Sequence, residues 1–150
     1  MQGDPNNYGR AQDRTQEPPG EPISPQDERT WSAFSHASIL VWPATGLLPI
    51  APLIIWLVHR DRSARVGFHA LQSLWYQLAW LAIATVGGIL GTLFSIVTLG
   101  LGIFLVIPLA AIIGLIPFAH SLYAAYRVYT GADFRYPYIA DRMEGFDRTL

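Results

Sequence analysis

The feature that most constrains this chain is the distribution of its charges. From Val66 to Tyr126 the sequence contains no Asp, Glu, Lys or Arg, and neither does the stretch from Thr30 to Val58. A helix in water needs a polar face, and these two stretches cannot supply one. A transmembrane helix needs about 20 mostly apolar residues, which both stretches exceed. The sequence therefore predicts an all-α integral membrane protein, a compact bundle of helices in a lipid bilayer.

Helix start and stop signals predict three or four helical segments. Ser24 before Pro25 is a typical helix start, and Ser63 can cap a later helix. Gly131 is a typical C-terminal stop, and the glycines of residues 98–102 suit a tight reversal. The expected segments cover approximately residues 25–42, 53–58, 64–94 and 103–129.

Proline and glycine break the first apolar region. Pro43, Gly46, Pro49 and Pro52 follow one another closely, a density that ends a helix rather than bending it. Residues 31–58 are therefore either one kinked span or two short helices that form a hairpin. Each short piece is marginal for a full crossing of the bilayer. We favour the hairpin.

The chain divides into a polar tail, an apolar domain and a polar end. Residues 1–26 are rich in Gln, Pro, Asn, Gly and Glu and lack the apolar core of a signal peptide, which predicts a disordered tail. Residues 27–143 form the predicted transmembrane domain, and residues 144–150 form a polar C-terminal end. The sequence has no Cys, which excludes disulfides and thiolate metal sites.

The positions of Arg predict the orientation in the membrane. The loop at residues 59–65 and the segment 132–150 each carry three Arg, whereas the turn at 98–102 carries none. Positively charged loops stay on the cytoplasmic side of a membrane. We therefore expect a cytoplasmic C-terminus.

Polar and aromatic side chains follow one face of the segment that begins near residue 64. They recur at helical spacing and are named here the polar stripe: His69, Gln72, Ser73, Tyr76 and Gln77. Ser32, Ser35 and His36 form a similar patch on the first segment. Polar groups in apolar spans often mark a functional site. Hydrogen bonding between helices explains them equally well, and we favour that explanation.

A cofactor site is the alternative explanation for the histidines. His36, His69 and His120 are candidate ligands for a haem or a chlorin, because imidazole is a common axial ligand. No two His lie four residues apart, and no carboxylate lies among them, so a structural metal site is not expected. We predict no bound cofactor, with a haem or chlorin as the alternative.

A second pattern consists of small residues at helical spacing: Ala84, Gly87, Gly88 and Gly91. Such residues let two helices approach closely. Packing between helices of the same chain is favoured here over homodimerisation.

The apolar spans contain little that could catalyse a reaction. They hold no carboxylate pair, no Ser-His-Asp set and no phosphate-binding loop, so we predict that the protein is not an enzyme. The expected partners are the lipid bilayer and other membrane protein subunits. Nothing in the sequence indicates a nucleic-acid partner.

Three stretches carry a resemblance to a known family. They are residues 27–38 with Trp31 and His36, residues 52–61 followed by Phe68-His69-Ala70, and residues 124–137 ending in Phe134-Arg135-Tyr136-Pro137. In this order they resemble a family of small bacterial membrane proteins of unknown function that is similar to Tic-twenty, a component of the chloroplast inner-envelope import machinery. The resemblance covers about residues 27–143 and implies a helical membrane protein with both ends on the same side, located in the bacterial inner (cell) membrane.

The sequence and the resemblance together predict a non-catalytic membrane module that acts through protein partners, in translocation or in the assembly of a membrane complex. The alternative is an accessory subunit of a respiratory or photosynthetic complex. In that role His36, His69 or His120 would contact a chlorin, a haem or a quinone.

Overall fold

The computed structural model describes residues 23–44, 46, 49–137 and 139–141, and the regular structure in this part of the chain is entirely helical. The predicted tail at residues 1–26 and the predicted end at 144–150 lie largely or wholly outside the described residues. The elements are α2 (Pro25–Ala37), the short 3-10 helix η2 (Ser38–Val41), α3 (Ile50–His59), α4 (Ala64–Val97) and α5 (Ile103–Tyr129). The prediction of an all-α bundle is confirmed.

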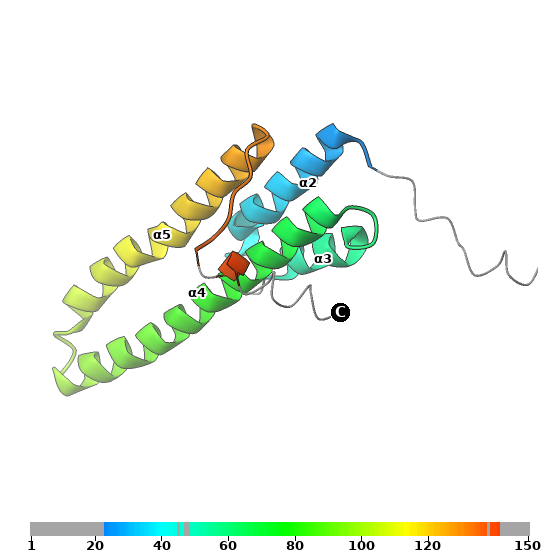
Figure 1. The fold of residues 1–150 in the computed structure, drawn as a ribbon. Coiled ribbons are helices and arrows are strands. Elements are labelled where there is room, and N and C mark those ends of the chain that lie inside the picture. The colour runs from blue at the N-terminus through cyan, green and yellow to red at the C-terminus, as the bar shows by residue number, and fades with distance from the viewer. Residues whose placement is uncertain (1–22, 45, 47–48, 138, 142–150) are drawn as a thin grey trace, which may run out of the picture.

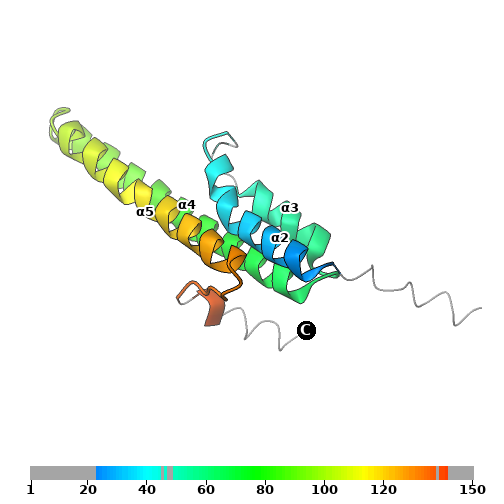
Figure 2. The same ribbon diagram turned by 90° about the horizontal axis from the view of Figure 1, so that it is seen from above.

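The bundle has two parts of different thickness. Helices α4 and α5 run antiparallel as one long hairpin (Figure 1). Helices α2 and α3 pack beside only half of that hairpin, the half with the start of α4 and the end of α5 (Figure 2). The other half extends beyond them as two helices alone. We call these parts the four-helix end and the projecting hairpin.

The helices begin at the side chains that the sequence indicates. The Ser24 Oγ accepts a hydrogen bond of 3.1 Å from the N–H of Asp27, with Pro25 in the first turn of α2. The Ser63 Oγ accepts one of 3.2 Å from the N–H of Val66 at the start of α4. These bonds satisfy N–H groups that have no partner within the helix. After α5, Gly131 adopts a φ of 90°, a backbone conformation that favours glycine.

The first apolar region forms a hairpin of two helices, and a single kinked span is wrong. The chain turns between η2 and α3, where the prolines stand. The Ser63 hydroxyl, in the loop after α3, donates a hydrogen bond of 2.5 Å to the Glu28 Oε1 near the start of α2. The beginning of α2 and the end of α3 therefore lie at the same end of the bundle.

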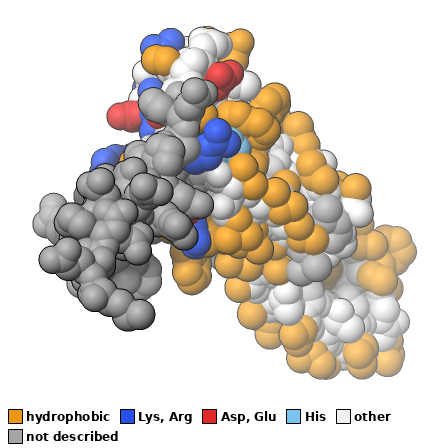
Figure 3. Space-filling view, turned by 90° about the vertical axis from the view of Figure 1, so that its right-hand side faces the viewer, with side chains coloured by type: hydrophobic (Ala, Val, Ile, Leu, Met, Phe, Trp, Pro, Cys, Tyr) orange, Lys and Arg blue, Asp and Glu red, His pale blue; other side chains and the backbone are white. Residues whose placement is uncertain are grey.

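The surface of the long hairpin is apolar and exposed. Helices α4 and α5 contain windows with mean hydropathy of 2.0 and 2.3, of which only 0% and 6% is buried inside the molecule. Hydrophobic side chains cover this region, whereas Arg, Asp and Glu gather at the opposite end (Figure 3). The core helix of a soluble protein would be buried, so these two helices fit a bilayer instead. The protein is an integral membrane protein.

The tip of the hairpin is a compact turn without charged groups. Leu99 and Gly100 both adopt positive φ, 54° and 89°. The Thr98 Oγ1 accepts a hydrogen bond of 2.8 Å from the N–H of Gly102, and the N–H of Gly100 donates to the Ser95 carbonyl at 2.7 Å. Serine, threonine and backbone groups thus satisfy one another where the chain reverses.

Small residues on α4 have two different surroundings. A Cβ built on Gly91 would lie 2.7 Å from the Cγ1 of Val106 on α5, so the absence of a side chain lets the two helices meet. A Cβ on Gly87 or on Gly88 would have no atom within 4 Å. Gly91 therefore serves packing within the chain, and the other two glycines leave an open face.

This difference yields a prediction for matched substitutions. Gly91→Ala should destabilise the protein by about 1–3 kcal/mol relative to Gly88→Ala, because only the first introduces a clash into a packed contact. Both substitutions gain the same helix propensity, about 1 kcal/mol, so the comparison isolates the clash. Equilibrium unfolding in mild detergent measures the difference. Equal stability of the two variants would contradict the packing role of Gly91.

Candidate functional site

The polar residues of the chain's interior meet at the four-helix end. The polar stripe of α4 faces inward, and each of its five side chains is buried. Ser32, Ser35 and His36 of α2 are buried opposite them, with Ser38 of η2. We call this set the polar core. Helical spacing placed each group on one face, and the fold of α2 against α4 brings the two groups together.

Two histidines form the centre of the polar core. The Nε2 of His36 and the Nδ1 of His69 lie 3.2 Å apart, and both side chains are almost fully buried. Their rings meet edge to face with centroids 5.3 Å apart. Two neutral imidazoles can make such a bond, since one ring nitrogen donates and the other accepts. The pair therefore joins α2 to α4 without a buried charge.

A chain of hydroxyl and amide groups continues the contact along the helices. The Ser73 Oγ donates to the carbonyl of Ser35 at 2.6 Å. The Gln77 Nε2 donates to the Ser38 Oγ at 3.0 Å and to the Ser73 Oγ at 3.1 Å. Together with the histidine pair, these bonds hold α2 and η2 on α4 over two turns of the helix.

Tyrosine and histidine extend the core to α5. The Tyr76 hydroxyl lies 3.1 Å from the Nδ1 of His120. Tyr76 also stacks on Tyr136, with centroids 3.9 Å apart and an interplanar angle of 8°. The Tyr136 hydroxyl lies 3.1 Å from the Ser121 Oγ. His120 is thus a neighbour of the aromatic part of the core, whereas His59 is separate and bonds the Ile55 carbonyl of its own helix.

The segment after α5 returns to the core and closes it. Tyr136 is only 1% exposed, although it lies outside the helices. The Gln72 amide, oriented by its hydrogen-bond partners, donates to the Phe134 carbonyl at 3.2 Å and accepts from the N–H of Tyr136. Burial raises the pKa of the Tyr136 phenol, so its hydroxyl keeps its proton. The C-terminal segment is therefore part of the site.

The sequence did not identify Tyr136 as a residue of the site. The pattern that could have indicated it is an alternation of inward and outward side chains. Phe134 and Tyr136 face inward, whereas the Arg135 guanidinium lies over the Phe68 ring, 5.5 Å from its centroid. A period of two is the mark of extended chain. Only three residues carry this pattern, which is too short to distinguish an inserted strand-like segment from an exposed polar end.

The distance between the histidines can be compared with the space that a haem or a chlorin needs. A macrocycle bound between two histidines needs ring nitrogens about 4 Å apart, twice a metal–nitrogen bond of about 2 Å. His36 and His69 touch directly, and His120 faces a tyrosine hydroxyl. The histidines would have to separate before a haem or a chlorin could enter between them. No group of three or more metal-ligating side chains is found among the described residues.

The polar core yields a prediction that separates structural from cofactor roles. His69→Ala should destabilise the protein by about 0.6–2 kcal/mol through the lost hydrogen bond between helices. The absorbance spectrum of the purified protein should show no Soret or chlorin band before or after the change. A band that disappears in His69→Ala would overturn the cofactor-free interpretation.

Cysteines at positions 36 and 69 should also cross-link in the otherwise Cys-free chain. Cysteines at 36 and 90 provide the control, because position 90 lies about 30 Å farther along α4.

Comparison with known proteins places most of the chain in one family. A family model described as the magnetosome magnetite crystal formation protein family (MamF/MmsF) matches residues 27–143. No curated protein and no solved structure gives a significant match. The inferred similarity to the Tic-twenty family is wrong, because the family match lies elsewhere. The motifs that suggested it, around His36, Phe68-His69-Ala70 and Tyr136, meet in the polar core. Such short patterns reflect the packing of that core and do not identify a protein-import component.

Proposed function

The chain belongs to the magnetosome magnetite crystal formation protein family, and from this premise we propose that it is a non-catalytic module of the magnetosome membrane that organises other membrane proteins for crystal formation. The family consists of membrane proteins involved in crystal formation. Action through protein partners, without catalysis, is the part of the assignment that we infer.

The observation that carries this proposal is the separation of apolar and polar surface along the bundle. The projecting hairpin exposes Leu, Ile, Val and Phe on all sides, which suits lipid or the apolar face of another helix. Helix α4 alone, with its 34 residues, is about 50 Å long, more than the roughly 30 Å of a hydrocarbon core. The hairpin of α4 and α5 as a whole is thus long enough to cross the hydrocarbon core.

The use of the polar groups supports a structural role over a catalytic one. His36 bonds His69, the Ser73 hydroxyl donates to the Ser35 carbonyl, and the Gln77 amide donates to the Ser38 hydroxyl. Each of these bonds joins two different elements of the fold. Side chains engaged in this way fix the arrangement of the helices rather than present reactive groups to a substrate.

Two surfaces support contact with partner proteins. Gly87 and Gly88 leave an open face on α4, where a neighbouring transmembrane helix could approach the backbone closely. The loop between α3 and α4 exposes Arg60 and Asp61, which pair at 3.4 Å at the charged end of the bundle. One surface lies within the membrane and the other at its boundary.

Complementation in a magnetite-forming bacterium that lacks this gene tests the function. Gly88→Leu should leave the amount of protein in the magnetosome membrane unchanged, lower its cross-linking to other membrane proteins and impair crystal formation. Val86→Leu adds bulk at a neighbouring exposed position and should behave like the wild type. The proposal fails if Gly88→Leu complements fully. It also fails if His69→Gln, present at the normal level, abolishes crystal formation, since that result would indicate a chemical role.

The orientation of the module is a separate prediction. Arg60, Arg62 and Arg65 precede or begin α4, and Arg127 and Arg135 lie near the end of α5, all at the four-helix end. Single cysteines at Asp61 and Ala132 should therefore react with an impermeant thiol reagent from the cytoplasmic side, and a cysteine at Leu99 from the opposite side. Asp61 suits this experiment because its side chain is exposed, whereas the nearby Ser63 is buried. Labelling of positions 61 and 99 from the same side would contradict this topology.

A further inference from the structure

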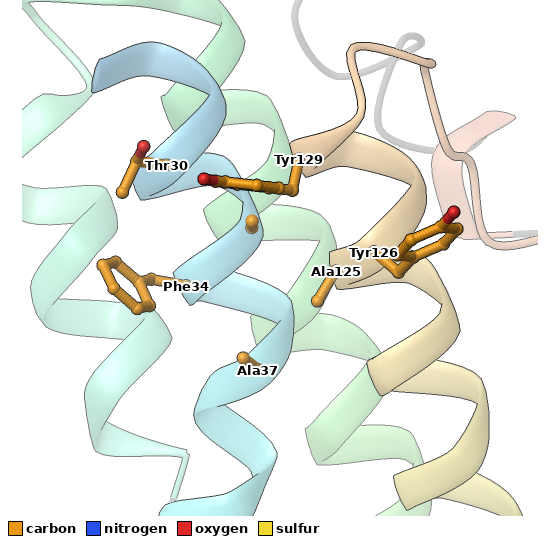
Figure 4. Close-up of a pocket in the computed structure, with 7 residues that line it drawn as sticks. Thr30, Phe34, Ala37, Ala125, Tyr126 and Tyr129 are labelled. Carbon is orange, nitrogen blue, oxygen red and sulfur yellow. The ribbon is translucent and has the colours of Figure 1, made fainter. Parts of the chain in front are cut away.

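A groove runs between α2 and α5 on the outer surface of the four-helix end. Its volume is about 250 Å³ (Figure 4). The alanines Ala33 and Ala125 are nearly buried and form its floor, with Ala37 farther along α2. Short side chains on two adjacent helices leave this space open.

Larger side chains form the rim of the groove. Phe34, Tyr126 and Tyr129 are each about half exposed, and the Tyr129 ring reaches from α5 toward Thr30 of α2 (Figure 4). The accessible lining is apolar. A cavity of about 150 Å³ can hold a benzene molecule, so this groove has room for a longer apolar group. It is too small for a helix, which is about 10 Å wide.

An arginine lies near the Thr30 end of the groove, beside the residues that line it. The Arg29 guanidinium carbon lies 3.3 Å from the position of a Cβ on Gly131, where the start of α2 meets the end of α5. Arg29 and Gly131 adjoin the rim in sequence, next to Thr30 and close to Tyr129. Within the described part of the chain, Arg29 forms no ion pair.

The carboxylates nearest to Arg29 in sequence are engaged elsewhere. Asp27 accepts a hydrogen bond of 2.8 Å from the Ser24 hydroxyl, and Glu28 accepts one from Ser63. Arg29 is thus the positive charge that an anion at this end of the groove would meet.

Exposed aromatic side chains near the groove indicate its depth in the membrane. Trp31 on α2 and Tyr123, Tyr126 and Tyr129 on α5 are exposed around this level. Exposed Trp and Tyr side chains concentrate at the boundary between hydrocarbon and headgroups. The groove therefore lies where an acyl chain begins and where a phosphate is within reach of an arginine.

We propose that the groove between α2 and α5 binds an anionic phospholipid, with an acyl chain along Ala33, Ala37 and Ala125 and the phosphate at Arg29. The apolar floor accounts for the chain, and the guanidinium accounts for the preference for a net negative headgroup. This binding site is independent of the proposed role in crystal formation. It would give one face of the module a preference among membrane lipids.

Native mass spectrometry of the purified protein tests the proposal. The probes are phosphatidylglycerol and phosphatidylcholine with identical acyl chains. The wild type should bind phosphatidylglycerol about fivefold more tightly, the effect of one basic residue near an anionic group. Arg29→Gln should abolish this preference. Arg127→Gln is the matched control, since Arg127 lies on α5 and bonds the Tyr123 hydroxyl at 2.8 Å, and it should retain the preference.

A second variant examines the apolar part of the site. Ala37→Phe should fill the groove and reduce the binding of both lipids severalfold. Equal affinity of the wild type for the two lipids would overturn the proposal, as would an equal loss in Arg29→Gln and Arg127→Gln. A change of oligomeric state in Ala37→Phe with unchanged lipid binding would identify the groove as a contact between two copies and would also overturn it.

The wild type provides a test that does not depend on the folding of any variant. Raising the salt concentration from about 0.05 M to about 0.5 M should reduce the preference for phosphatidylglycerol, because screening weakens the attraction between exposed charges. A preference that is independent of salt would contradict a site built on Arg29.

Discussion

The hydrogen bonds of the polar core are the interaction on which the rest of the bundle depends. In a lipid bilayer, apolar side chains gain little by leaving lipid for another helix, so association relies on close packing and on polar contacts between helices. Helix α2 and η2 are short, and without such contacts little would stabilise their packing on α4. The His36–His69 pair and the bonds of Gln77 supply them. These polar residues therefore account for the packing of α2 and η2 on α4.

The projecting hairpin is stabilised in a different way. Gly91 lets α4 approach Val106 of α5, and the Thr92 hydroxyl donates a hydrogen bond to a carbonyl one turn earlier in its own helix. No charged residue lies between Val66 and Tyr126, so no charged side chain of this hairpin has to be placed in lipid. The two parts of the molecule therefore differ in surface and in what holds them together. The hairpin exposes most of the apolar surface, and the four-helix end carries the charges and the groove between α2 and α5.

Much of the helical framework was predictable because its signals are local. A serine before a helix bonds an N–H three residues later, and Ser24 and Ser63 both do so. The stripe from His69 to Gln77 was predictable for the same reason, since helical periodicity alone puts these residues on one face. The cofactor alternative rested on residue types without their distances. The mistaken family resemblance rested on short motifs. The residues of these motifs pack together in the core, and such packing does not identify a function.

The sequence by itself determined that this chain enters a membrane, that it does so as helices, and where most of those helices begin and end. Each of these properties depends on solvent and on contacts within a few residues. Only the tertiary structure decided that His36 meets His69, that Tyr136 returns to stack on Tyr76, and that Arg29 stands at the end of an apolar groove. These contacts join residues far apart in the chain, or different helices. They depend on the direction that the chain takes after its prolines and after Gly131, and no local pattern specifies that direction.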